Sequence, residues 1–306
     1  MQNKKLNIII DTDPGVDDSI ALCFALNSQK LDVKLITISQ GNVPISVGKR
    51  NALYIRELYN RTDIPVAVGR PKSLIREYHD ATVIHGKGGM GKFKHSPPKT
   101  FEITKPAYEA MYETICKYEN NITIVTLGPL TNIALLLTKY PDVKRKISKL
   151  VIMAGSLLGN GNTNDWAEFN SFVDPEALQV VLDSEIDIAL LPMEIGNTKA
   201  VFWEDDIKYM ARLNKTGAMF SKMFSGYKEI GEHIMMGQTH DACAIFYLID
   251  PIMFETKRAL VNINTNDLPG KTTVRYHKQG PIKVIENVDL DRFYNLFFDE
   301  LKKIKY

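Results

Sequence analysis

The sequence predicts an α/β protein with an open, mostly parallel (mixed) sheet, a Rossmann-like arrangement in which helices cover both faces. Two observations predict this class. Short, continuously apolar runs such as LNIII (6–10) and ITIVTL (122–127) alternate with longer segments of helical pattern. Strands of this kind are typical of parallel sheets that are buried on both faces. No linker rich in Pro, Gly or Ser divides the 306 residues, so we expect one domain over 1–306.

The expected elements follow one another in a simple alternation. Apolar runs that predict strands lie at 6–10, 33–39, 122–127, 149–155 and 187–193. Helical patterns follow these runs, for example DDSIALCFALN after the first and VGKRNALYIRELYN after the second. A more helical stretch then leads to Pro251, after which the pattern changes. Shorter, more polar strands are expected at 257–264, 272–277 and 282–286, before a final helix near 290–303.

Composition argues against several classes of protein. The formal net charge is +2 and no basic run stands out, so we expect no nucleic-acid partner. No apolar run approaches membrane-spanning length, and the apolar stretch near the N-terminus is too short for a signal peptide. The three cysteines are widely spaced, which indicates reduced thiols. We therefore expect a cytoplasmic protein with no membrane partner.

The segment DTDPGVDD (11–18) places four carboxylates directly after the first strand: Asp11, Asp13, Asp17 and Asp18. Like charges this close raise one another's pKa values unless a positive charge lies among them. A single Asp here would often be a helix N-cap, but four around one Pro-Gly turn favour a metal or catalytic role. Clustered carboxylates are typical ligands of a hard divalent cation.

Other polar motifs follow the later strands, where ligands bind in such sheets. They are QGN (40–42), LGPLTN (127–132) and AGSLLGNGNTNDWAEFN (154–170). This rim has no cluster of Lys or Arg, so it suits a neutral polyol beside a cation better than a phosphate. HGKGGMGK (85–92) lacks the Gly-Lys-Ser/Thr ending of a phosphate loop, and we interpret it as a mobile loop. THDACA (239–244) begins a helix with a His whose role, in the core or in function, stays open.

Taken together, these motifs resemble the nucleoside hydrolases of the inosine-uridine-preferring type. DTDPGVDD, GN (41–42), HGKGGMG, GPLTNIA (128–134), AEFN (167–170) followed by DPEA, and HDACA (240–244) occur in that family's order. The resemblance implies an enzyme that hydrolyses the N-glycosidic bond of purine or pyrimidine ribonucleosides, with nucleoside salvage as its setting. It also implies a small-molecule ribonucleoside as the partner, and a homodimer or homotetramer.

The resemblance also implies roles for individual residues. The calcium ligands would be Asp13, Asp18, the carbonyl of Leu127 and Asp241, completed by water and two ribose hydroxyls. Asp13 would be the general base that activates water, and His240 would lie at the leaving base. The residues expected at the ribose are Asp17, Asn42, Met153, Asn162, Glu168 and Asn170.

Some positions depart from the family's pattern. Leu127 stands where many members have Thr or Val, which is harmless if only its carbonyl binds metal. Glu194 stands where an Asp-x-Thr stretch is common, so no role is carried onto 191–197. The loop at 225–238 cannot be aligned, and the preferred base stays open.

Two alternatives from other classes stay open at this point. A strand that ends in Asp-x-Asp also opens the haloacid-dehalogenase-type phosphatases, but that hypothesis leaves GPLTN, EFN and HD unexplained. A non-catalytic nucleoside- or sugar-binding protein could keep the same pocket. Every residue assigned to chemistry is present, so nothing in the sequence favours loss of activity.

Overall fold

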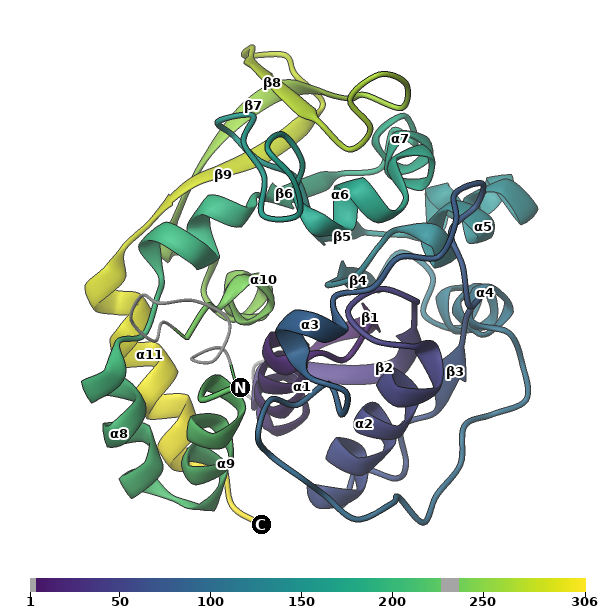
Figure 1. Cartoon of the computed structure of the whole chain (residues 1–306). Helices are drawn as coiled ribbons and strands as arrows, with labels where there is room; N and C mark the ends of the chain where they lie inside the picture. Colours follow the sequence, from purple (N-terminus) through teal and green to yellow (C-terminus); the bar gives the residue numbers. More distant parts are fainter. Residues whose placement is uncertain (1–3, 227–236) are drawn as a thin grey trace.

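The computed structural model describes residues 4–226 and 237–306 (Figure 1). Within these ranges one sheet of 9 strands has the order β3-β2-β1-β4-β5-β6-β9-β7-β8. The strands are β1 Leu6–Thr12, β2 Leu31–Ile38, β3 Val66–Val68, β4 Thr123–Thr126, β5 Lys149–Met153, β6 Ile188–Leu191, β7 Phe254–Ile263, β8 Thr272–Tyr276 and β9 Ile282–Val288. The strands from β3 to β9 in this order are mutually parallel, whereas β7 runs antiparallel to both β8 and β9. The predicted mostly parallel, mixed sheet is confirmed.

The helices divide between the two faces of this sheet. In the described residues they are α1 Val16–Asn27, α2 Ile45–Leu58, α3 Thr82–His85, α4 Ala107–Lys117, α5 Thr131–Lys139, α6 Phe169–Val173, α7 Pro175–Leu182, α8 Glu204–Leu213, α9 Lys215–Phe224, α10 His240–Ile249 and α11 Leu290–Lys303. Alternate residues of β1 point to opposite faces. Ile8 and Ile10 join one buried cluster with α1, α2, α9, α10 and α11, while Ile9 joins another with α4, α5 and α7. Helices on both faces are therefore confirmed.

The predicted element boundaries differ from the observed ones mainly at short or exposed elements. β3 has only three residues, too few for an apolar period, and was not predicted as a strand. β7 begins at Phe254, three residues earlier than expected. Its first residues pair with β9, but residues 255–258 face solvent and so show no apolar pattern in the sequence. Helix α9 ends at Phe224, and residues 227–236 of the loop at 225–238 lie outside the described residues.

The order of the strands places the polar motifs together. From β1 the chain passes outward to β2 and β3, and it then returns to pair β4 with the other side of β1. Such a reversal opens a crevice at the carboxyl ends of the strands, where ligands of open α/β sheets bind. DTDPGVDD leaves β1 and Leu127 leaves β4 at this edge, and Leu127 donates its backbone N–H to the carbonyl of Asp11. No helix in the described ranges is long and apolar enough to cross a membrane.

Candidate active site

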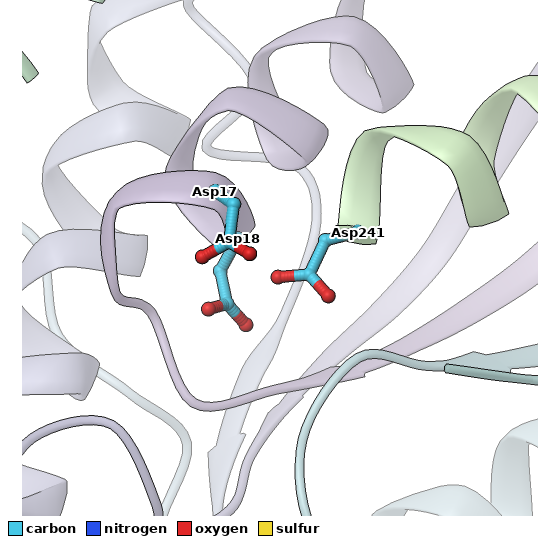
Figure 2. Close-up of side chains that lie close together, drawn as sticks. All are labelled: Asp17, Asp18 and Asp241. Atoms are coloured by element: carbon cyan, nitrogen blue, oxygen red, sulfur yellow. The ribbon is translucent and has the colours of Figure 1, made fainter. Parts of the chain in front are cut away.

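Three carboxylates meet at the carboxyl edge of the sheet. Asp17 and Asp18 lie in the first turn of α1, and Asp241 lies in the first turn of α10. One oxygen from each lies within 4.8 Å of the others, and all three residues are buried. Figure 2 shows the side chains converging from the two helix starts. Residues more than 220 positions apart in the sequence thus form one acidic cluster.

The carboxylate of Asp18 is held by donors from the turn that precedes α1. Its Oδ1 accepts the Thr12 hydroxyl at 2.6 Å and the Asp13 backbone N–H at 3.1 Å. Its Oδ2 accepts the Gly15 N–H at 3.1 Å and the Asn42 side-chain amide at 2.7 Å. Asp18 therefore closes the N-terminal turn of α1 as a capping residue would, and the same contacts fix its orientation within the acidic cluster.

Asp13 lies beside this cluster in a close-fitting cradle. Its Oδ2 accepts the Asn42 backbone N–H at 2.7 Å, whereas its buried Oδ1 has no hydrogen-bond partner among the described residues. A Cβ at Gly128 would lie 2.4 Å from Oδ1, and one at Gly41 would lie 1.9 Å from Oδ2. Only glycine at these two positions leaves room for the carboxylate. Asp13 thus supplies one carboxylate oxygen that is fixed in place and has no partner within residues 4–226 and 237–306.

The electrostatics of the cluster favour a bound cation. Burial is the largest cause that raises the pKa of Asp13 and of Asp241 well above the ordinary range, and it raises that of Asp17 to about 8. The charge of Asp18 raises all three further. No Lys or Arg among the described residues lines the cavity beside them. Oxygen donors only, with unpartnered oxygens on Asp13 and Asp17, fit a hard divalent metal ion.

A cavity opens over the cluster and contains most of the predicted site residues. Those that line it are Asp17, Asn42, Leu127, Met153, Asn162, Glu168, Asn170, His240 and Asp241. Asp13 and Asp18 are not part of the lining and lie buried next to it. The metal ligands expected from the resemblance included Asp13, whereas the closest group of carboxylate oxygens contains Asp17 in its place.

The start of α6 forms a second rigid wall. Glu168 caps this helix: its Oε1 accepts the Asn170 N–H at 2.8 Å, and its Oε2 accepts the Gly155 N–H at 2.9 Å. Burial still raises the pKa of Glu168, in spite of these donors. Asn170 donates its side-chain amide to the carbonyl of Leu127 at 2.7 Å and to that of Met153 at 3.1 Å. AEFN therefore links the loops after β4 and β5.

Two buried histidines also line the cavity, one beside the turn before α1 and the other next to Asp241. His240 begins α10, and burial together with the neighbouring His85 lowers its pKa to about 4. Burial also lowers the pKa of His85 to about 4, and its Nδ1 accepts the Val16 N–H at 3.0 Å. Both rings are therefore uncharged at neutral pH, and because the Nδ1 of His85 accepts the Val16 N–H, the proton of that ring lies on Nε2.

The sequence analysis assigned no role to several lining residues. They are Ala81, Ile84, His85, Thr163, Phe169 and Gln238. His85 belongs to HGKGGMGK, which we interpreted as a loop, and it is in fact the last residue of the short helix α3. The place of HGKGGMG among the family's motifs was the signal that could have identified it. Gln238 lies in the segment that could not be aligned, so no sequence signal was available for it.

Comparison with known proteins agrees with this arrangement. The model of the inosine-uridine preferring nucleoside hydrolase family matches residues 8–295. The non-specific ribonucleoside hydrolase RihC of Klebsiella pneumoniae is 38% identical over 261 residues, which cover 85% of this chain and 84% of that protein. Among solved structures, a plant nucleoside hydrolase (PpNRh1) has a TM-score of 0.93 and 28% identity, covering 98% of this chain and 99% of the other.

A purine-preferring ribonucleoside hydrolase from Gardnerella vaginalis has a TM-score of 0.90 and 27% identity, covering 97% of this chain and 98% of that one. These similarities cover the sheet, both helical layers and the cavity. Enzymes of this family depend on a metal ion, and the acidic cluster is where this chain could hold one. The chain therefore belongs to the inosine-uridine preferring nucleoside hydrolase family and is a ribonucleoside-hydrolysing enzyme.

Proposed function

We propose that this enzyme hydrolyses the N-glycosidic bond of purine and pyrimidine ribonucleosides in a calcium-dependent reaction, with water activated by Asp13. One observation carries the proposal: the carboxylates of Asp17, Asp18 and Asp241 lie within 4.8 Å of one another beside a cavity without Lys or Arg. A neutral ribose with vicinal hydroxyls suits such a site, whereas a phosphate group would be repelled by it.

Calcium would be held by Asp13, Asp18, Asp241 and the carbonyl of Leu127. Calcium takes six to eight oxygen ligands in a flexible geometry, which matches a set of carboxylates and one carbonyl. Bound there, it supplies positive charge that lowers the pKa of a coordinated water and orients the ribose hydroxyls. Asp17 lies in the same cluster and lines the cavity, so it can reach a ribose hydroxyl.

Asp13 is suited to accept the proton of the attacking water. Its Oδ2 is occupied by the Asn42 N–H, which leaves Oδ1 as the proton acceptor. Without a cation, burial and the charge of Asp18 raise its pKa well above the ordinary range; bound calcium would lower it, so that the carboxylate is ionised and can accept a proton. The two glycines that enclose the carboxylate keep it from rotating away from the water.

The ribose end of the cavity would stabilise the transition state. Cleavage of a glycosidic bond passes through a sugar cation that resembles an oxocarbenium ion. Fixed carboxylates and amide oxygens around the ribose favour this charge without having to reorganise. Asn42, Met153, Asn162, Glu168 and Asn170 line the cavity and would hold the sugar in one orientation.

His240 would assist departure of the base. Its pKa of about 4 means that the imidazole is neutral in the free enzyme at neutral pH. Negative charge that develops on the departing base favours a protonated neighbour, so the pKa of His240 would rise as the bond breaks. His85 lines the same cavity, and a positive charge on it would lower the pKa of His240.

The assignment is tested by incubating the purified enzyme with a panel of nucleosides and assaying free ribose. We expect release from uridine and inosine with calcium present, and none after thorough chelation. A phosphatase would instead release phosphate from nucleotides, and a binding protein would release nothing. The family match supports hydrolysis over both alternatives. The role in salvage and the homodimeric or homotetrameric state stay predictions from the family resemblance, and the cytoplasmic location stays a prediction from composition.

A further inference from the structure

The side chain of Glu194 accepts three hydrogen bonds from the loop that follows β5. It follows β6, is only 5% exposed, and its Oε1 accepts the Ser156 hydroxyl at 2.7 Å. The same oxygen accepts the backbone N–H groups of Leu157 at 2.9 Å and Leu158 at 3.1 Å. Residues 156–163 belong to no helix or strand, so their N–H groups depend on such partners.

The far end of this loop lies against the cavity. The N–H groups of Asn162 and Thr163 both donate to the carbonyl of Ala167, at 3.2 and 3.3 Å. The side-chain oxygen of Asn162 accepts the Phe169 N–H at 2.9 Å. Asn162 and Thr163 line the cavity, and these contacts to Ala167 and Phe169 hold the end of the loop that is farther from Glu194. Releasing the Glu194 end would therefore leave both residues attached at one end only.

The segment that carries Glu194 also contacts the start of α10. Met193 donates its N–H to the carbonyl of Gly155 at 2.9 Å, and the carbonyl of Gly196 accepts the Thr239 N–H at 3.1 Å. A Cβ at Gly196 would lie 2.5 Å from the backbone of His240, so the two backbones are in close contact. Residues 193–196 thus join the 156–163 loop to the helix start that bears His240.

We infer that Glu194 is a positioning residue, which holds the 156–163 loop so that Asn162 meets the substrate in the right place. The inference rests on the proposed contact between Asn162 and the ribose. Glu194 makes no ion pair with any residue that the structure describes, and its buried Oε2 has no hydrogen-bond partner there. The loop therefore depends on Oε1 as a hydrogen-bond acceptor, and the negative charge of Glu194 has no cationic partner among the described residues.

This distinction defines two variants of nearly equal size. Glu194→Met removes the acceptor, and Glu194→Gln keeps a carbonyl oxygen that the same three donors can reach. Losing hydrogen bonds to a charged group costs enough to change an equilibrium by about tenfold or more. We expect Glu194→Met to raise KM for uridine and inosine about tenfold with a smaller effect on kcat, and Glu194→Gln to stay within about threefold of wild type.

Glu57 provides a matched control, because it holds a different loop with the same kinds of donor. Its carboxylate accepts the N–H groups of Lys99 and Thr100 and the hydroxyl of Thr100, and it does not line the cavity. Glu57→Met should lower the melting temperature without changing KM. If Glu194→Met does not fold, Ser156→Ala removes one of the three donors and should raise KM about two- to threefold.

A double-mutant cycle with Asn162→Ala tests the route. If Glu194 acts through the loop, the change in KM of the double variant, expressed as a free energy, will be much smaller than the sum of the changes in the two single variants. An unchanged KM in Glu194→Met, a Gln variant as impaired as the Met variant, or strictly additive effects would each overturn the inference. A wild-type enzyme that releases no ribose would instead overturn the proposed function.

Discussion

The two ends of the cavity are built in different ways. The proposed sugar end consists of motifs that directly follow β1, β4 and β5, and two of its carboxylates, Asp18 and Glu168, are each fixed by four donors. The proposed base end combines His85 from α3 with Gln238, just before α10, and His240 at the start of α10, and none of these three side chains is a carboxylate. In the proposed function, charge and rigidity are thus concentrated where the constant ribose would bind, while the variable base would meet neutral groups.

The largest expected effect is at the sugar end. Asp18→Ala removes a proposed calcium ligand and leaves the donors from Thr12, Gly15 and Asn42 without their acceptor. We expect loss of calcium binding by calorimetry and loss of ribose release below detection. Asp32→Asn, a surface carboxylate beside Lys34, serves as the control and should behave as wild type. Full activity in Asp18→Ala would show that the acidic cluster is not the metal site.

The next largest effect sharpens the contrast, because it should depend on the leaving group. His240→Ala should slow natural nucleosides by roughly two to four orders of magnitude, the usual contribution of general acid catalysis. Nitrophenyl riboside, whose leaving group needs no proton, should react at nearly the wild-type rate. Equal losses on both substrates, measured as kcat/KM, would place the role of His240 at the sugar end instead.

Ribose recognition gives a third expectation, which needs no variant. A site built to bind hydroxyls rejects a substrate that lacks one far more strongly than it rejects a missing methylene. We expect 2′-deoxynucleosides to be poorer than ribonucleosides by about two or more orders of magnitude in kcat/KM. Comparable values for uridine and deoxyuridine would mean that Asp17 and the metal do not hold the 2′-hydroxyl.

The smallest effect concerns pH. Without metal, the folded protein keeps protons that the unfolded chain has lost, because the pKa of Asp17 rises from 3.8 to about 8. The stability that this provides is complete below pH 3.8 and is lost as the pH rises through about 8. Calcium replaces those protons, so its stabilisation should increase between pH 5 and pH 8.

Scanning calorimetry with and without calcium measures this directly. We expect calcium to raise the melting temperature by several degrees more at pH 8 than at pH 5, and Asp241→Asn to remove the difference. An equal shift at both pH values would contradict competition between calcium and protons at the acidic cluster.

The same contrast explains how much the sequence alone could predict. Asp13, Asp17 and Asp18 lie in one eight-residue motif after a clear apolar strand, so both their clustering and their place in the sheet were predictable. Short β3 and the contact between Glu194 and the 156–163 loop were not, since no local pattern encodes pairing between distant segments. Gln238 reaches the cavity only through tertiary packing, and no local pattern marked it, whereas the position of HGKGGMG among the motifs could have identified His85.

The central claim is that Asp13 activates water at a ribose held by calcium, and Asp13→Asn tests it most directly. Asn keeps the size of the side chain and one oxygen ligand, but it cannot accept a proton. Binding of calcium and of a slowly reacting nucleoside should be retained within about tenfold, while kcat for uridine falls by about two to four orders of magnitude. A variant that binds both and turns over uridine at the wild-type rate would contradict the claim.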